Sequence, residues 1–199
     1  MEAEKGRSSL LSRRRQGRIL SAAFFALALA VAASGQTPGG EPVSVLGVKN
    51  PFLLSAANDA VSLALKKLES PGCQQIFTDF RDGAGRPLQA RLDALDHTGA
   101  SFLRILRFAN GERLSPCQSR GILAATTPTS HVIFLCGIQF FEKEHRDPEF
   151  AAALVIHEML HSLGLRENPP ASNEITARVV ERCGPLAAGE GPTATALVK

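Results

Sequence analysis

The sequence predicts an α+β fold in which three short strands, a buried helix and a following C-terminal helix form one domain. The segment Phe150–Leu163 is apolar on nearly every face, which is typical of a buried helix. The segment His131–Cys136 is rich in β-branched and aromatic residues and is too short for a helix. Hydrophobic residues make up 44% of the 199 residues and charged residues 21%, so the composition excludes a disordered chain and fits one ordinary domain.

Residues 1–33 are predicted to be a secretory signal peptide. Four arginines between positions 13 and 18 precede an apolar stretch of 15 residues, Ile19–Ala33, in which Ala30-Val31-Ala32 fits an A-x-A cleavage site. The alternative is an uncleaved membrane anchor, although this stretch is short for a span of about 20 residues. We therefore expect a secreted or periplasmic protein that has no stable membrane insertion after signal cleavage.

The remaining chain is expected to hold three segments: a loose leader over residues 34–50, the folded domain over residues 51–184 and a mobile tail over residues 185–199. Residues 1–33 carry six of the 22 basic and two of the 19 acidic residues, which leaves 16 basic and 17 acidic residues for the rest. The body is therefore near neutral, and no Tyr or Trp is available to stack on bases. These features exclude nucleic acid as a partner, and the sequence does not indicate an oligomeric state.

Helical and strand patterns alternate along the domain. A helix is predicted over Ala60–Leu68, with Asn58 or Asp59 as its N-cap and Pro71-Gly72 as its end. The other elements expected before the buried helix are a short helix over Gln74–Phe80, a turn over Arg81–Gly85, a helix over Leu88–Leu95, and strands over Ser101–Phe108, Gly121–Thr126 and His131–Gly137.

Four cysteines follow the predicted signal: Cys73, Cys117, Cys136 and Cys183. An even number of cysteines in an oxidising compartment favours two disulfides. Their spacings contain no C-x-x-C pair, which argues against a structural zinc site. Three pairings are possible, and the sequence does not choose between them.

The buried helix carries the pattern His157-Glu158-Met159-Leu160-His161. Asp147 is its predicted N-cap, and Pro148 lies in its first turn. Residues four apart share one face of a helix, so both imidazoles can bind the same metal ion. Glu158 is one position further round, where it can act as a general base and then as a general acid. The sequence therefore predicts a metal site with His157 and His161 as ligands and Glu158 as the catalytic residue.

Gly164 follows this pattern and can adopt the left-handed conformation that ends a helix. After a loop, a last helix is expected over Asn173–Cys183, with Ser172 as its N-cap.

The stretch His157–Glu167 resembles the zincin metallopeptidases. The resemblance covers some 15–30 residues and implies a zinc-binding helix beneath a small twisted sheet. It also implies a strand along the rim of the cleft that pairs with an extended substrate, for which His131–Cys136 is the candidate. The rest of the chain resembles small exported bacterial proteins of the zincin type.

A catalytic zinc usually has three protein ligands, and two candidates exist for the third. Glu167 occupies the third-ligand position of the pattern H-E-x-x-H-x-x-G-x-x-H, with a carboxylate in place of an imidazole. Glu174, on the last helix, is the alternative, in the manner of zincins that take a Glu from a second helix. The Met-containing turn of the metzincins is absent, because no Met follows position 159. The chain also has no Tyr to stabilise an oxyanion, so His131 is a candidate for that role.

These features together predict an exported zinc-dependent peptidase that acts on a peptide or protein substrate, with Zn²⁺ as its cofactor. The alternative is a non-enzymatic exported binding module in which the metal serves structure alone. The missing Tyr and the small size favour this second interpretation.

Overall fold

The computed structural model describes residues 45–46 and 48–184. The predicted signal peptide, most of the predicted leader and the predicted tail lie outside these residues. Within the part that is described, no helix is both long and apolar enough to cross a membrane.

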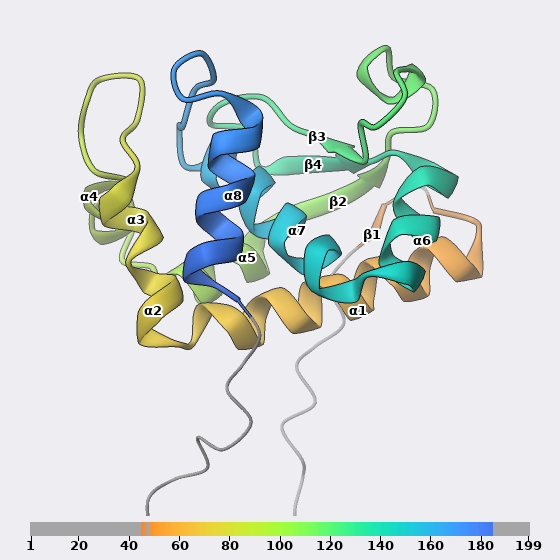
Figure 1. Ribbon diagram of the computed structural model, residues 1–199, viewed down its shortest axis with the longest axis horizontal. Helices are drawn as coiled ribbons and strands as arrows, with labels where there is room; N and C mark the ends of the chain where they lie inside the picture. Colours follow the sequence, from red (N-terminus) through yellow and green to blue (C-terminus); the bar gives the residue numbers. More distant parts are fainter. Residues whose placement is uncertain (1–44, 47, 185–199) are drawn as a thin grey trace, which may run out of the picture. The chain divides into compact units, whose positions relative to one another are not determined.

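A small mixed sheet forms one layer of the domain (Figure 1). Its strands are β1 (Val45–Leu46), β2 (Arg107–Asn110), β3 (Ala124–Ala125) and β4 (Val132–Leu135), in the spatial order β1-β2-β4-β3. The two pairs β1–β2 and β2–β4 are parallel, and β3 pairs antiparallel with β4. The α+β class is confirmed. The sheet has one strand more than the expected three, since β1 lies in the segment predicted to be a leader.

Helices α1, α5 and α7 lie below this sheet in the view of Figure 1, and α1 and α7 pack against each other. The helices are α1 (Pro51–Leu68), α2 (Pro71–Gln74), α3 (Ile76–Asp79), α4 (Leu88–Ala94), α5 (Gly99–Ile105), α6 (Gly137–Arg146), α7 (Pro148–Ser162) and α8 (Ser172–Arg182).

The first helix begins earlier than predicted. The Asn50 side chain accepts a hydrogen bond from the backbone N–H of Phe52 at 3.0 Å, and Pro51 occupies the first helical position. This cap fits the helix start better than Asn58 or Asp59, which therefore lie inside α1.

The strand predicted over Ser101–Phe108 is wrong for its first half, which is the helix α5. The Thr98 hydroxyl accepts from the Ser101 backbone N–H at 3.1 Å, and the Ser101 hydroxyl accepts from the Thr98 N–H at 2.8 Å. This reciprocal capping box starts a helix where a strand between turn residues was expected. Helix α6 was not predicted, whereas α4 and α7 lie where the sequence places them.

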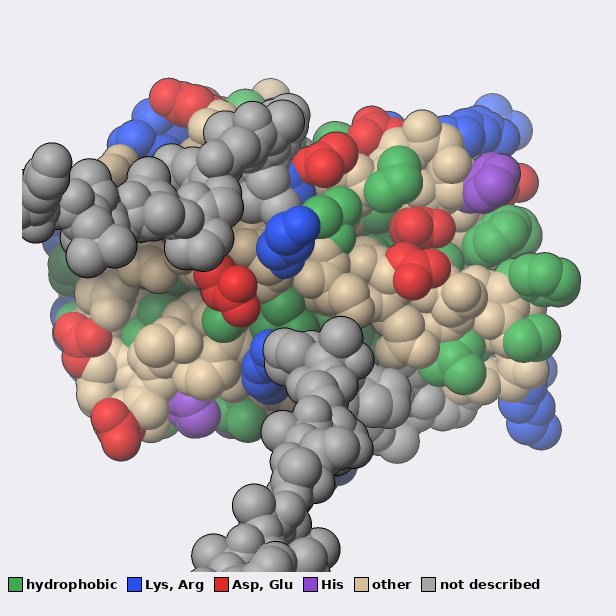
Figure 2. All heavy atoms as spheres, turned by 90° about the horizontal axis from the view of Figure 1, so that it is seen from below, with side chains coloured by type: hydrophobic (Ala, Val, Ile, Leu, Met, Phe, Trp, Pro, Cys, Tyr) green, Lys and Arg blue, Asp and Glu red, His purple; other side chains and the backbone are tan. Residues whose placement is uncertain are grey.

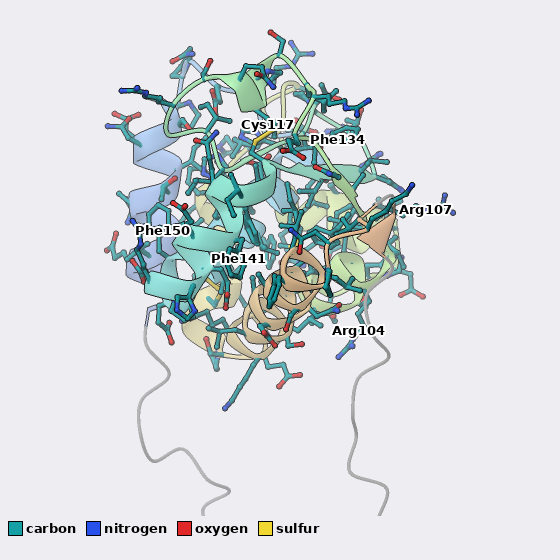
Figure 3. The ribbon with its side chains drawn as sticks, turned by 90° about the vertical axis from the view of Figure 1, so that its right-hand side faces the viewer. Arg104, Arg107, Cys117, Phe134, Phe141 and Phe150 are labelled. Atoms are coloured by element: carbon teal, nitrogen blue, oxygen red, sulfur yellow. A yellow bond between two sulfur atoms is a disulfide. The ribbon has the colours of Figure 1, made fainter. Side chains whose placement is uncertain are left out.

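Two disulfides join distant parts of the domain. Cys73 in α2 is bonded to Cys183 just after α8, and Cys117 is bonded to Cys136 (Figure 3). The prediction of two disulfides is confirmed, and the structure resolves the pairing that the sequence left open. Two disulfides also fit an extracellular protein.

Lys67 fastens the end of α8 to the centre of the domain. Its side chain is buried, and its ammonium donates to the carbonyl oxygens of Cys183 and Gly184 at 2.8 and 2.9 Å. It also forms an ion pair with Glu149 in the first turn of α7. Charge pairing and hydrogen bonding together compensate the cost of burying this ammonium.

The face seen in Figure 2 carries an apolar patch on its right-hand side, around the start of α1 and α6. Phe52 in α1 and Ile138 in α6 are the most exposed large hydrophobic residues of the described part of the chain, and the Phe52 ring lies 6.1 Å from that of Phe141, centroid to centroid. These residues do not line the cavity that contains His157.

Candidate metal centre

The end of α7 brings the histidine pattern and the following loop together. At this end the backbone N–H of Gly164 donates to the His161 carbonyl at 2.8 Å, and that of Leu165 donates to Leu160 at 3.1 Å. This Schellman arrangement requires a left-handed residue, and Gly164 has a φ of 109°. The chain turns back over the helix end, which returns Glu167 towards the two histidines.

Three side chains converge at this point. The Nε2 atoms of His157 and His161 lie 3.0 Å apart. An oxygen of Glu167 lies 3.4 Å from Nε2 of His161 and 3.8 Å from Nε2 of His157. Both histidines are buried, whereas Glu167 is exposed on one side.

Neighbouring groups fix the tautomer of each histidine. Nδ1 of His161 lies 3.0 Å from the carbonyl oxygen of Leu165, which can only accept, so Nδ1 carries the proton. Nδ1 of His157 lies 2.9 Å from the hydroxyl of Thr176, which donates its own proton to the Ser172 carbonyl at 3.1 Å. The hydroxyl therefore accepts from His157, and in the neutral form of either ring Nε2 bears a lone pair.

These two lone pairs face each other and cannot form a hydrogen bond. Burial lowers the pKa of His157 to about 4, and the neighbouring His161 adds to this effect, so His157 is not the ring that carries an extra proton near neutral pH. A cation between the rings would satisfy both nitrogens. Ligands about 2.0–2.1 Å from a tetrahedral metal lie about 3.3 Å apart, which is close to the separations found here. His157, His161 and Glu167 can therefore hold a metal ion.

The group opens on a cavity of about 440 Å³. Its walls include the edge strand β3, Thr126 and Pro128 on one side, and the two histidines, Glu158 and Glu167 on the other. The sequence predicted that His131–Cys136, the segment of β4, would lie at this rim. The strand found there is β3, because β4 is paired on both sides, with β2 and with β3. One edge of β3 is therefore not paired with another strand among the described residues.

Glu158 lies on this cavity beside the histidines and is only 5% exposed. Burial raises the pKa of its carboxyl group from 4.5 to about 8, and the charge of Glu167 acts in the same direction. A backbone hydrogen bond from Thr126 opposes the shift. Near neutral pH this carboxyl group can both accept and release a proton, as a general acid–base residue must.

Two other candidate residues lie outside this site. The Glu174 carboxylate accepts from the backbone N–H of Ala171 at 2.9 Å, so it caps α8 and lines a different cavity with Arg178 and Arg182. Ser172, predicted to be the N-cap, is the first residue of α8. His131 is exposed and its ring packs edge-on against Phe102 at 5.8 Å, away from the cavity lining.

Sequence reasoning missed Thr176, Leu165 and the strand β3 as parts of the site. Thr176 and Leu165 hold the histidine rings, but neither the hydroxyl nor the backbone carbonyl belongs to a recognisable pattern. The pairing order of the strands places β3 at the rim, and the order of the segments along the chain does not show it.

The chain was compared with protein-family models, with curated proteins and with solved structures, and none of the three comparisons gives a match.

Proposed function

We propose that this chain is an exported zinc-dependent peptidase of the zincin type. The convergence of His157, His161 and Glu167 on one cavity, with buried Glu158 beside them, carries this proposal. Two imidazoles and one carboxylate are a donor set of catalytic zinc sites, in which the fourth position stays open. The two disulfides and the predicted signal peptide support export.

The chemistry assigned to Glu158 follows from its place and its protonation. Zn²⁺ held by the three side chains would supply a Lewis acid that polarises the carbonyl of the cleaved bond. Glu158 takes a proton from the water molecule that attacks this carbonyl. It then gives the proton to the nitrogen that leaves when the C–N bond breaks.

Strand β3 is the proposed platform for the substrate. Its residues line the same cavity as Glu158, and one of its edges is not paired with a described strand, so an extended peptide could add to the sheet there by backbone hydrogen bonds. Backbone pairing would align the cleaved bond with the metal site and leave the side chains free for selection.

The first test is the substitution Glu158→Gln, which removes the general base and keeps the size of the side chain. We expect the variant to bind one Zn²⁺ per chain and to lose at least 100-fold in hydrolysis of an unstructured substrate such as casein. Wild-type cleavage should stop with a chelator and return with zinc. Zinc-loaded wild type that cleaves no peptide, or a variant that retains activity, would contradict the proposal; the former result favours a binding module.

The second test concerns the third ligand. We expect Glu167→Ala to weaken zinc binding at least tenfold, as measured by competition with a chromophoric chelator, because one of three ligands is lost. Glu174→Ala is the matched control: it should bind zinc as the wild type does and lose about 1 kcal/mol of stability through the missing helix cap. Equal zinc affinities for the two variants would contradict the assignment of Glu167.

A further inference from the structure

A second, polar cavity adjoins the candidate metal centre. It has a volume of about 330 Å³, and the charged residues in its lining are Asp82, Arg86, Arg91 and Arg166. The loop before α4 and the turn after α7 form it, and these two segments lie side by side in Figure 1. None of the four residues belongs to the metal group, by which we mean His157, His161 and Glu167.

The charges in this cavity do not balance. Asp82 is fully engaged: it accepts from the backbone N–H groups of Ala84 and Arg86 at 2.8 and 3.0 Å and forms an ion pair with the Arg86 guanidinium at 2.7 Å. Arg91 and Arg166 form no ion pair with any residue that the structure describes. The lining therefore keeps two positive charges that no acidic residue of the described chain neutralises, both on groups suited to bind a carboxylate through two hydrogen bonds.

The backbone holds this lining in place. The N–H of Gly83 donates to the Gly164 carbonyl at 3.2 Å, and Asp82 and Leu165 form an antiparallel bridge. The Arg166 side chain lies directly over Gly83: a Cβ at position 83 would come within 2.5 Å of its Nε. Arg91 is half-buried on α4. The position of Arg166 thus depends on the absence of a side chain at Gly83, and that of Arg91 depends on α4.

The two cavities are neighbours on the path of an extended substrate. Pro128 lines both of them. The consecutive residues Arg166 and Glu167 line one cavity each, and their Cα atoms are therefore about 3.8 Å apart. Strand β3 leads along the chain to Pro128, so a peptide that pairs with β3 reaches the second cavity beyond this proline.

We propose that this second cavity is a carboxylate-binding subsite, formed by Arg91 and Arg166, for an acidic side chain or a free C-terminus of the peptide held at the metal centre. Because the consecutive residues Arg166 and Glu167 line one cavity each, the carboxylate belongs a few residues from the cleaved bond. The inference rests on the proposed peptidase for the identity of the ligand, but binding of a carboxylate can be measured without catalysis.

The test uses the purified protein after metal removal, so that a carboxylate cannot bind to zinc. N-acetylglutamate α-amide and N-acetylalanine are titrated against their uncharged partners, N-acetylglutamine α-amide and N-acetylalanine amide. Binding is followed through the backbone amide NMR signals of Gly83, Ala84 and Gly164. We expect saturable shifts with at least one acid and at least tenfold weaker binding of its uncharged partner. The acid that binds more tightly shows whether a side chain or a terminus is recognised.

Three variants and a control locate the binding. Arg91→Gln and Arg166→Gln should each weaken binding at least tenfold. Gly83→Ala should do so too, because its Cβ displaces the Arg166 guanidinium. Arg104→Gln removes an exposed arginine of α5 outside the cavity and should leave the affinity unchanged. Equal binding of acids and amides, or affinities that neither cavity arginine affects, would overturn the proposal.

Cleavage assays separate this inference from the proposed function. If the acids bind and zinc-loaded protein cleaves no peptide, the peptidase proposal fails and the carboxylate site stands. If peptides are cleaved with equal kcat/KM whether or not they carry an acidic group, and the acids do not bind, the subsite fails and the peptidase stands.

Discussion

Glu158 combines the position proposed for the catalytic residue with a cost to folding. Its carboxyl group is 5% exposed and lies beside a second carboxylate, Glu167, and burial together with this charge raises its pKa to about 8. A raised pKa means that the folded protein holds this proton more tightly than the unfolded chain does. In the metal-free protein, stability is therefore lost as the pH rises from about 4.5, the unfolded value, through about 8.

The substitution Glu158→Gln should remove this pH-dependent loss. In the presence of a chelator, the variant and the wild type should have similar stabilities near pH 4.5. The variant should become more stable by about 2–5 kcal/mol near pH 9, since each unit of pKa shift corresponds to about 1.4 kcal/mol. Urea unfolding of both proteins at several pH values measures the difference. A stability difference that does not change with pH would show that Glu158 is hydrated in the metal-free protein.

The sequence predicted which side chains lie close together in the site where a rule about neighbouring residues applied, such as helix spacing or a glycine turn. The four-residue spacing places His157 and His161 on one face, and the Gly164 turn brings back Glu167 as its spacing indicates. The role given to His131 had no such rule behind it, and its ring packs against Phe102. Thr176 was not found because its contact with His157 depends on how α8 packs on α7, which is a tertiary property.

At the scale of elements, α8 supports the candidate metal site. It packs against α7, with Ile175 and Val179 buried. Thr176 on the same helix accepts from Nδ1 of His157, so the position of α8 fixes the ring and directs its Nε2 towards the proposed metal. Removal of a hydrogen-bond partner of this kind typically lowers metal affinity 10- to 100-fold.

The substitution Thr176→Val tests this support. Valine has nearly the same shape as threonine but no hydroxyl, so the His157 ring loses its hydrogen-bond acceptor. We expect zinc affinity to fall about 10- to 100-fold, measured by competition with a chelator. Thr176→Ser restores the hydroxyl and should bind zinc within a few-fold of the wild type. Wild-type affinity in the valine variant would show that α8 does not orient this ligand.

The elements were predicted well where one signal dominated and poorly where two competed. Helix α7 has an N-cap, a proline in the first turn and an unbroken apolar run, and it lies where these signals place it. The segment that contains Ser101 lies between turn residues, which suggested a strand, but it also carries a capping box, and the capping box determines its structure. Strand β3 has two residues, and its place at the cavity depends on a strand order that no local pattern encodes.

For the whole domain, the long-range links hold the C-terminal end of the described chain to the helices α1 and α2. The disulfide Cys73–Cys183 closes a segment of 110 residues that includes every residue of the metal group, whereas Cys117–Cys136 closes one of 19 residues. Lys67 reinforces the first link, because it binds the carbonyls of Cys183 and Gly184. All four cysteine side chains are buried, so the two links differ mainly in the length of chain that they close.

Removal of either disulfide should therefore destabilise the domain. Removal of Cys73–Cys183, which closes the longer segment, should lower the free energy of unfolding more. A cross-link restricts the unfolded chain, and chain entropy gives about 5 kcal/mol for a closed segment of this length and about 3 kcal/mol for the shorter one. Each pair is replaced by alanines, Cys73→Ala with Cys183→Ala and Cys117→Ala with Cys136→Ala, and unfolding is followed in urea with a chelator present. The chelator matters because bound zinc would stabilise every variant by mass action and hide the difference. A greater loss from the Cys117–Cys136 pair would contradict this ranking and would show that packing around β4 stabilises the domain more than the closure of the long segment does.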